Sequence, residues 1–418
     1  MACHGNNATP PSPAIAPGAE RIDPAEAALG ARIDPRIPAL MPGFDAPFFQ
    51  AGLAGYSDAA MRIIARRLGC PCCVTEALLD RTLLAGGRGF AKADLGDLHD
   101  NIPGGAEDHP LVGQIMGSDP EEMAVGAVKM AEQGRRGERA YRDMVYTRPG
   151  EFPRRCDREE PKDHAADESL INPDATFQAI DVNLACPVKK ISAKARGGHW
   201  LADPDGALEI LKAVRQAVPE SIPVTVKLRR GSDDSPEAER NFMRLFDGAY
   251  ELGCAWTTVH GRTVEQKYVG PSRWTFLREL VQRRPDCIIF GSGDVWDVHD
   301  IFRMIAYTGV HAVSVARGCI GNPWIFRQAR QMMAGETPTP PTIAEQRDVL
   351  EQHFMLSVAL NGERKAGLMM RKFGVRFAAH HPQGEEVRRE FIAVKTVEDW
   401  RTVLNTHYEH TRELMPSA

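Results

Sequence analysis

The sequence has no hydrophobic run long enough to span a membrane, and its mean hydropathy is −0.32. Its first residues lack the charged region and the apolar stretch of a secretory signal. The nine cysteines are an odd number scattered through 418 residues, which fits reduced thiols better than a disulfide framework. We therefore expect a soluble, cytoplasmic protein without a membrane anchor.

The sequence also lacks the ligand spacing of a structural metal site. Three cysteines lie close together in Cys70-Pro71-Cys72-Cys73, but no second pair of Cys or His follows at a fitting distance. Cys72 and Cys73 begin an apolar run that is typical of a strand, so we expect them to pack in the core and expect no metal. No G-x-G-x-x-G follows a predicted strand, which argues against an open dinucleotide-binding sheet.

Short apolar runs do alternate with amphipathic helical stretches between about residues 47 and 335. The predicted strands are Pro47–Leu53, Cys72–Glu76, Leu111–Met116, Ile180–Leu184, Val224–Leu228, Trp256–His260, Cys287–Phe290 and Ala312–Val315. Helical patterns follow them, for example at Pro120–Gln133, Pro204–Val218, Pro236–Leu252 and Asp297–Tyr307. Eight such units predict the α/β fold of a (β/α)8 TIM barrel, with a doubly wound open sheet as the alternative.

Polar residues stand where the predicted strands end. They are Glu76, Gln114, Asn183, Lys227, His260, the run Gly291-Ser292-Gly293-Asp294 and the run Ala316-Arg317-Gly318. Active sites of such barrels lie at the carboxyl ends of the strands, so we expect these side chains to share one site. The two glycine segments follow the seventh and eighth strands, where barrels bind phosphate, and so indicate a phosphorylated cofactor or substrate.

Cys186 lies on the loop after the fourth predicted strand, with Asn183 three residues before it and Lys189 and Lys190 after it. A thiol beside cations can act as a proton donor or a nucleophile. A small buried cysteine at a tight turn is the more ordinary interpretation of such a residue alone. Its position at a strand end in the repeat favours a catalytic role.

Taken in order, these and other segments resemble the tRNA-dihydrouridine synthase family, and within it the bacterial B-type subgroup. The segments that carry the resemblance are Gly55–Asp58, Arg62, Val74–Glu76, Gly113–Pro120, Asp181–Lys190, Gly197-Gly198, Pro223–Arg229, Val259–Thr263, Tyr268, Gly270 and Ala316–Phe326. Single motifs are weak, but their order and spacing together are specific. The resemblance covers residues 46–134 and 177–410.

The resemblance implies an enzyme that binds FMN, reduces it with NADPH and passes a hydride to C6 of a uracil ring, while Cys186 supplies the proton to C5. By similarity, Gln114 and Lys227 hydrogen-bond the flavin ring, and Asn183 and His260 orient substrate or flavin. The residues implied at the FMN phosphate are Gly291, Ser292, Gly293, Ala316, Arg317 and Gly318.

Three segments depart from the pattern of the family. Ala51-Gly52-Leu53 stands where Ala-Pro-Met is usual, Ser292 replaces an Asn, and Leu184-Ala185 replaces a pair such as Met-Gly. Gly52 and Leu53 leave the position of the flavin at this strand undetermined, whereas Ser292 keeps a hydrogen-bonding side chain. Because the cysteine, lysine and histidine are all present, we expect an active enzyme.

The chain divides into three expected parts: a disordered segment at residues 1–40, the FMN-binding barrel at 41–335 and a helical RNA-binding domain at 336–418. A charged insertion at 135–178 is expected on the amino-terminal rim, either as a solvated loop or as an RNA-contacting arm. In the helical domain, Arg371 and Lys372 are either phosphate contacts to tRNA or ordinary solvated charge. The net charge of −5 argues against broad affinity for nucleic acid, although a local basic face can still bind it.

Two other functions remain open from the sequence. One is an FMN-dependent barrel oxidoreductase that acts on a free small molecule or on ribosomal RNA, and the other is a non-catalytic RNA-binding protein. The helical extension disfavours a free small substrate, which does not need it. The retained Cys186, Lys227 and His260 disfavour a protein that only binds. We expect a monomer, and the uridine that is reduced stays undetermined.

Overall fold

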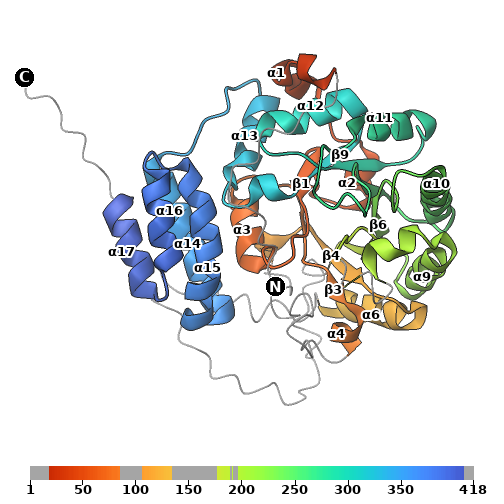
Figure 1. Cartoon of the computed structure of the whole chain (residues 1–418), viewed down its shortest axis with the longest axis horizontal. Coiled ribbons are helices and arrows are strands. Elements are labelled where there is room, and N and C mark those ends of the chain that lie inside the picture. Colours follow the sequence, from red (N-terminus) through yellow and green to blue (C-terminus); the bar gives the residue numbers. More distant parts are fainter. Residues whose placement is uncertain (1–17, 85–105, 134–176, 189–190, 192–195, 409–418) are drawn as a thin grey trace, which may run out of the picture.

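The strands of the protein form one parallel sheet that closes on itself (Figure 1). The computed structural model describes residues 18–84, 106–133, 177–188, 191 and 196–408. The strands that complete the barrel follow one another in chain order. They are β1 Phe48–Gln50, β2 Cys73–Val74, β4 Leu111–Met116, β5 Ala179–Asn183, β6 Val224–Arg229, β7 Thr257–His260, β8 Ile289–Ser292 and β9 Ala312–Val315. β2 pairs directly with the first residues of β4, and the short β3 (Leu78–Leu79) pairs with its last residues. The expected TIM barrel is confirmed.

Helices cover the outside of the barrel (Figure 1). They are α3 Ala59–Arg67, α4 Asp80–Leu84, α6 Pro120–Gln133, α9 Pro204–Ala217, α10 Pro236–Glu251, α11 Trp274–Arg283, α12 Val298–Thr308 and α13 Trp324–Met333. Asp203 and Ser235 cap α9 and α10, and a proline follows each of them in the first turn, as the sequence indicates. None of the helices in the described ranges is long and apolar enough to cross a membrane.

Aromatic side chains fill the amino-terminal half of the barrel interior. Phe290 lies at its centre, with ring centroids 5.4 Å from Phe49 and 5.3 Å from Trp256, and Phe44 packs edge-on against it at 5.9 Å. All four side chains are buried. Polar side chains that point inward therefore gather at the other end of the barrel, where the strands end.

The expected disorder of the N-terminal segment is wrong for residues 18–40. The segment forms a 3₁₀ turn at Ala19–Arg21 and two helices, α1 Pro24–Gly30 and α2 Arg36–Leu40. α1 packs against α12 and α13, while Ile37 of α2 joins the buried cluster inside the barrel. The barrel needs a cover at its amino-terminal end, so this segment belongs to the barrel domain. Residues 1–17 and most of the insertion at 135–178 lie outside the described residues.

The C-terminal part is all helical, as expected, and lies beside α3 and α13 (Figure 1). Its elements are α14 Ile343–Asn361, α15 Glu363–Phe377, a 3₁₀ turn at Ala378–His380, α16 Gly384–Ala393 and α17 Val397–His407. Trp400 holds the bundle together, with ring centroids 4.9 Å from Phe354 and 4.8 Å from Phe391. Trp324 of α13 meets Phe377 edge-on at 5.5 Å and joins the bundle to the barrel.

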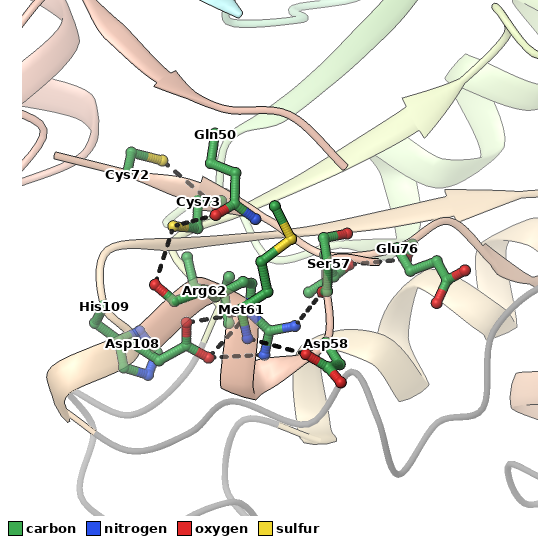
Figure 2. A network of polar contacts seen from close by, with 12 residues as sticks. Gln50, Ser57, Asp58, Met61, Arg62, Cys72, Cys73, Glu76, Asp108 and His109 are labelled. Carbon is green, nitrogen blue, oxygen red and sulfur yellow. Dashed lines mark hydrogen bonds and ion pairs between the residues drawn. The ribbon is translucent and has the colours of Figure 1, made fainter. Parts of the chain in front are cut away.

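A buried ion pair fixes α3 below the mouth of the barrel (Figure 2). Arg62 donates to both carboxylate oxygens of Asp108, the shortest contact being 2.7 Å, and neither side chain is exposed to solvent. The same guanidinium donates to the carbonyl oxygen of Ser57 at 2.9 Å. Burial acts against the charge of Arg62, but Asp108 outweighs it and raises the pKa of Arg62. The pair therefore joins the start of α3 to the 3₁₀ turn that ends at Asp108.

Replacing Arg62 with Met should lower the free energy of unfolding by about 3–5 kcal/mol, because Asp108 would lose its cationic partner inside the protein. The control is Arg283→Met, which breaks an exposed pair with Glu239 at 3.3 Å and should cost at most about 1 kcal/mol. Urea unfolding followed by tryptophan fluorescence measures both. Equal losses in the two variants would contradict a structural role for the buried pair.

Candidate active site at the carboxyl ends of the strands

A cavity opens at the carboxyl ends of the strands and holds about 1020 Å³ of empty space, its open mouth included. Most of the residues selected from the sequence line its wall: Gln114, Asn183, Cys186, Lys227, His260, Ser292, Gly293, Ala316 and Arg317. Residues more than 200 positions apart in the chain thus share one site. This juxtaposition follows from the parallel barrel, in which every strand ends at the same mouth.

A hydrogen-bonded chain of side chains links Asp181, which lies behind the wall of the cavity, to Gln114 and Asn183 in the wall. Asp181 accepts from the amide nitrogen of Gln114 at 2.7 Å and from the hydroxyl of Thr225 at 2.6 Å. The amide oxygen of Gln114 accepts from Asn183 at 2.8 Å, and the oxygen of Asn183 accepts from the backbone N–H of Ala185 at 3.0 Å. Because a carboxylate only accepts, Asp181 determines which way both amides point.

Lys227 of β6 lines the same cavity. Burial lowers the pKa of Lys227, while the nearby Asp181 raises it and Arg229 lowers it again. Burial also raises the pKa of Asp181, against the hydrogen bonds from Thr225 and Gln114 and the charge of Lys227. Burial therefore disfavours the charged form of both Lys227 and Asp181, and the opposite charge of each favours the charged form of the other. A buried carboxylate behind the wall thus supports the charge of a lysine that lines the cavity.

The loop that carries Cys186 is held from two sides. Gly198 donates its N–H to the carbonyl of Cys186 at 3.0 Å, and a Cβ on Gly197 would lie 2.8 Å from the Cβ of Cys186, so a side chain does not fit there. On the other side, Arg229 donates to the carbonyl of Ala185 at 2.9 Å. The half-buried thiol lines the cavity, close enough to Lys227 and Arg229 for their charges to interact.

His260 ends β7 with a defined tautomer. Its Nδ1 accepts from the backbone N–H of Arg262 at 3.1 Å, so the proton of the neutral ring lies on Nε2. Burial, and after it the charges of Arg229, Arg262, Lys227 and Arg317, hold the pKa of His260 well below its usual range. The ring therefore offers a neutral N–H donor in a strongly cationic site.

Glycines bring the backbone close to the cavity at two walls. A Cβ on Gly293, whose φ is +111°, would lie 2.4 Å from the hydroxyl oxygen of Ser272. Gly52 lies against the carbonyl oxygen of Thr75, which would be 2.3 Å from an added Cβ. A side chain therefore does not fit at this position in this structure. At both positions the backbone packs against other protein atoms too closely for any side chain.

Arg317 lies at the rim between two aromatic rings. Its guanidinium carbon is 4.3 Å from the ring centroid of Trp296 and 5.1 Å from that of Tyr268. Asp294 lies 3.8 Å away, but its carboxylate accepts from Arg262 at 2.7 and 2.8 Å and from the N–H of Ser272 at 2.6 Å. Burial and the neighbouring Arg262 lower the pKa of Arg317. The arginine is thus positioned by stacking and faces the cavity.

Four of the selected residues lie elsewhere. Gly291 packs against Met304 and Val310 on the helix side of the sheet, and Gly318 packs against the carbonyl of Val295. Neither contributes to the cavity wall. Arg371 and Lys372 lie on α15, where Arg371 contacts the carbonyl of Ile392 at 3.4 Å and Lys372 contacts the carbonyl of Gly55. The expected role of the two glycines at the phosphate of a cofactor stays a prediction.

The sequence interpretation did not assign roles to several residues that shape the site. They are Asp181, Arg229, Arg262, Tyr268, Asp294 and Trp296. Asp181, Arg229 and Arg262 lie within the segments that carry the family resemblance. Only their neighbours in those segments were assigned a role. Trp296 offers no sequence signal, because its stacking partner Arg317 comes 21 positions later, in the 3₁₀ turn that follows the next strand, β9.

The fold and the site define a TIM-barrel enzyme with a cationic cavity. A family model described as "Dihydrouridine synthase (Dus)" matches residues 159–412. The chain belongs to the dihydrouridine synthase family, which confirms the resemblance seen in the sequence and makes the protein an oxidoreductase.

Curated relatives agree with this family. A probable tRNA-dihydrouridine synthase of Mycobacterium leprae (strain TN) is 32% identical over 243 residues, which are 57% of this chain and 61% of the relative. The tRNA-dihydrouridine synthase B of Proteus vulgaris is 32% identical over 252 residues, 60% of this chain and 76% of that protein. Among solved structures, a histamine dehydrogenase of Rhizobium sp. 4-9 has a TM-score of 0.47 at 12% identity, covering 80% of this chain and 51% of that one, and we draw nothing from it.

His260 should stay neutral, with its proton on Nε2, when the pH falls to about 6, because burial and four cations oppose a further positive charge. NMR of the protein with ¹⁵N-labelled histidine measures the protonation state, and the spectrum of His260→Gln assigns the signal. A ring that is doubly protonated at that pH would contradict the proposed electrostatics of the cavity.

Proposed function

We propose that the protein reduces specific uridines of tRNA to 5,6-dihydrouridine, with FMN as its cofactor and NADPH as the reductant. The observation that carries the proposal is one cavity, in a member of this family, that brings Cys186, Lys227 and His260 together with the Gln114 amide. The reaction needs a hydride donor and a proton donor that face the same double bond.

The cavity suits a flavin mononucleotide. Gly52 and Gly293 bring backbone without side chains to the cavity wall, and the oriented amides of Gln114 and Asn183 can hydrogen-bond a flat polar ring. Lys227 would lie where negative charge develops on the reduced ring. Arg317, with Ser292, Gly293 and Ala316, would hold the phosphate at the rim. Reduced FMN, when bound, supplies the hydride to C6 of the uracil.

The residues of this chain supply the other requirements of the reaction. Cys186 donates its thiol proton to C5, and the loop contacts of Gly198 and Arg229 hold the sulfur at the cavity wall. A thiol is acidic enough to give up a proton near neutral pH and to be reprotonated by solvent. His260 orients the substrate or flavin as a neutral donor. NADPH would supply the electrons.

The helical domain is the part that we propose binds tRNA. Exposed basic side chains lie on its surface, among them Arg364, Arg376 and Arg389. Arg376 of α15 lies close enough to Arg317 for the two charges to interact, so positive charge continues from the cavity to this domain. We propose Arg371 as one phosphate contact. Such contacts bind the RNA backbone without reading its sequence.

The proposal is tested by purifying the protein and recording its visible spectrum, and then by incubating it with NADPH and unmodified tRNA. Flavin absorbance, release of FMN on denaturation and a mass gain of two hydrogens on a tRNA uridine are the expected results. A colourless protein, or a flavoprotein that reduces only a free small molecule, would contradict the proposal.

Cys186→Ala should bind FMN and oxidise NADPH like the wild type, but form dihydrouridine about 10²–10⁴-fold more slowly, because a general acid contributes a factor of that order. Quantitative mass spectrometry of the same tRNA measures the rate. Cys287→Ala is the matched control, since Cys287 is another half-buried thiol but precedes β8 at the opposite end of the barrel. Equal rates for the two variants would make Cys186 a structural residue.

Arg317→Ala should purify with little FMN, because the phosphate loses its cationic partner. Arg278→Ala is the control, because Arg278 also stacks on an aromatic ring, Tyr307 at 4.6 Å, but lies on α11 outside the cavity wall. Flavin content is measured from the ratio of visible to ultraviolet absorbance. Full occupancy in Arg317→Ala would move the phosphate to another part of the rim.

A further inference from the structure

A short segment at the mouth of the barrel, Leu53–Ser57, connects β1 to α3 and is called here the lip segment. Leu53 and Ala54 line the cavity. Internal hydrogen bonds give the segment its turn: the N–H of Leu53 donates to the hydroxyl of Ser57 at 2.8 Å, and the N–H of Tyr56 donates to the carbonyl of Leu53 at 2.9 Å. The shape of this wall therefore depends on where the turn is held.

The turn is held at Gly55 from two parts of the molecule. The N–H of Gly55 donates to the carboxylate of Glu76, which follows β2 in the barrel and is buried. The carbonyl of Gly55 accepts from the ammonium of Lys372, which comes from α15 in the helical domain. Gly55 has a φ of +73°, a conformation that favours glycine and turns its peptide groups toward these two partners.

Aromatic contacts support the approach of Lys372. Its Nζ lies 4.6 Å from the ring centroid of Tyr56 in the lip segment and 5.3 Å from that of Phe373, its own neighbour. The two rings meet edge-on at 5.5 Å and 87°. A cation over aromatic faces is favourable when it is partly removed from water, as this half-buried lysine is. The ammonium of Lys372 and the ring of Phe373, both in the helical domain, thus contact Tyr56 in the lip segment.

The neighbouring Arg371 behaves differently. Its guanidinium contacts the carbonyl of Ile392 at 3.4 Å, inside the helical domain. Two adjacent basic residues that look equivalent in the sequence therefore have separate surroundings. The contacts of Lys372 with Gly55 and Tyr56 point to a role inside the protein, whereas phosphate binding would need its ammonium to turn outward.

We propose that Lys372 is a positioning residue: it fixes the lip segment against the cavity, so that the helical domain shapes the reaction site as well as binding RNA. Lys372 does not touch the reacting atoms in this proposal. Its effect on turnover rests on the proposed function, whereas its effect on the lip segment does not.

The experiment compares Lys372→Met, which keeps the length of the side chain but removes the ammonium, with Lys372→Arg, which can still donate to Gly55 and stack on Tyr56. Lys129→Met is the matched control, because Lys129 is also half-buried and contacts a backbone carbonyl, that of Leu84 at 3.3 Å, away from the cavity wall. Three quantities are measured for the full-length proteins: hydrogen exchange of the lip segment, turnover at saturating tRNA, and tRNA affinity at several salt concentrations.

Lys372→Met should exchange faster in the lip segment and lose turnover by about 10- to 100-fold at saturating tRNA, since small displacements of a reaction site cost factors of this order. Its tRNA affinity and salt dependence should stay those of the wild type, and Lys372→Arg should recover most of the turnover. Lys129→Met should match the wild type in all three measurements.

Two results would overturn the proposal. If Lys372→Met loses tRNA affinity and salt dependence while lip exchange and turnover are unchanged, Lys372 is a phosphate contact. If neither exchange nor turnover changes, the contact with Gly55 has no positioning role. Should the wild type itself form no dihydrouridine, the proposed function fails, but lip exchange in Lys372→Met still decides whether this lysine holds the segment.

Discussion

Backbone pairing at Gln50 closes the sheet, because this residue of β1 pairs with Cys73 of β2 on one side and with Val315 of β9 on the other. All the strands of the barrel run parallel, so closure carries every carboxyl end to the same mouth. The aromatic cluster around Phe290 fills the opposite half of the interior. The polar side chains that end the strands therefore meet one another, although the chain separates Gln114 from Arg317 by about two hundred residues.

Local charge, and not the net charge of the chain, decides what the cavity can bind. The protein carries −5 overall, yet the cations Lys227, Arg229 and Arg317 line the cavity, and one buried carboxylate, Asp181, lies behind its wall. The other carboxylate nearby, Asp294, is already paired with an arginine. The remaining positive charge suits an anionic ligand in a site of low dielectric constant. Burial, and after it the same positive charges, lower the pKa of His260 at the end of β7.

The helical domain and the barrel form one continuous packed structure at the mouth. Trp324 of α13 packs on Phe377 of α15, and α14 lies along α3, whose start is fixed by the buried pair of Arg62 and Asp108. The lip segment lies between this pair and Lys372. An RNA held by the helical domain would thus lie next to the wall that its uridine must enter. In the proposed function, RNA recognition and the reaction therefore meet at the lip segment.

The sequence alone predicted the elements whose signal is local. The bounds of β4 and β9 are those expected, the prolines that start α9 and α10 lie where the caps indicated, and the polar strand ends line one cavity. The short helices α1 and α2 were mistaken for disorder, because each buries only a few side chains and does so against distant parts of the barrel.

Other features were decided by the tertiary structure. A strand pattern tells which residues are buried, but not which partner a buried polar group meets across the sheet. Asp181 pairs with Gln114 and Thr225, and Lys372 meets Gly55 from 317 positions away. Gly293 lines the cavity, whereas Gly291, two positions earlier, packs against Met304 and Val310, since the direction in which a residue faces depends on the twist and closure of the barrel. Local periodicity determined the fold, and only the closed barrel determined the contacts of its site.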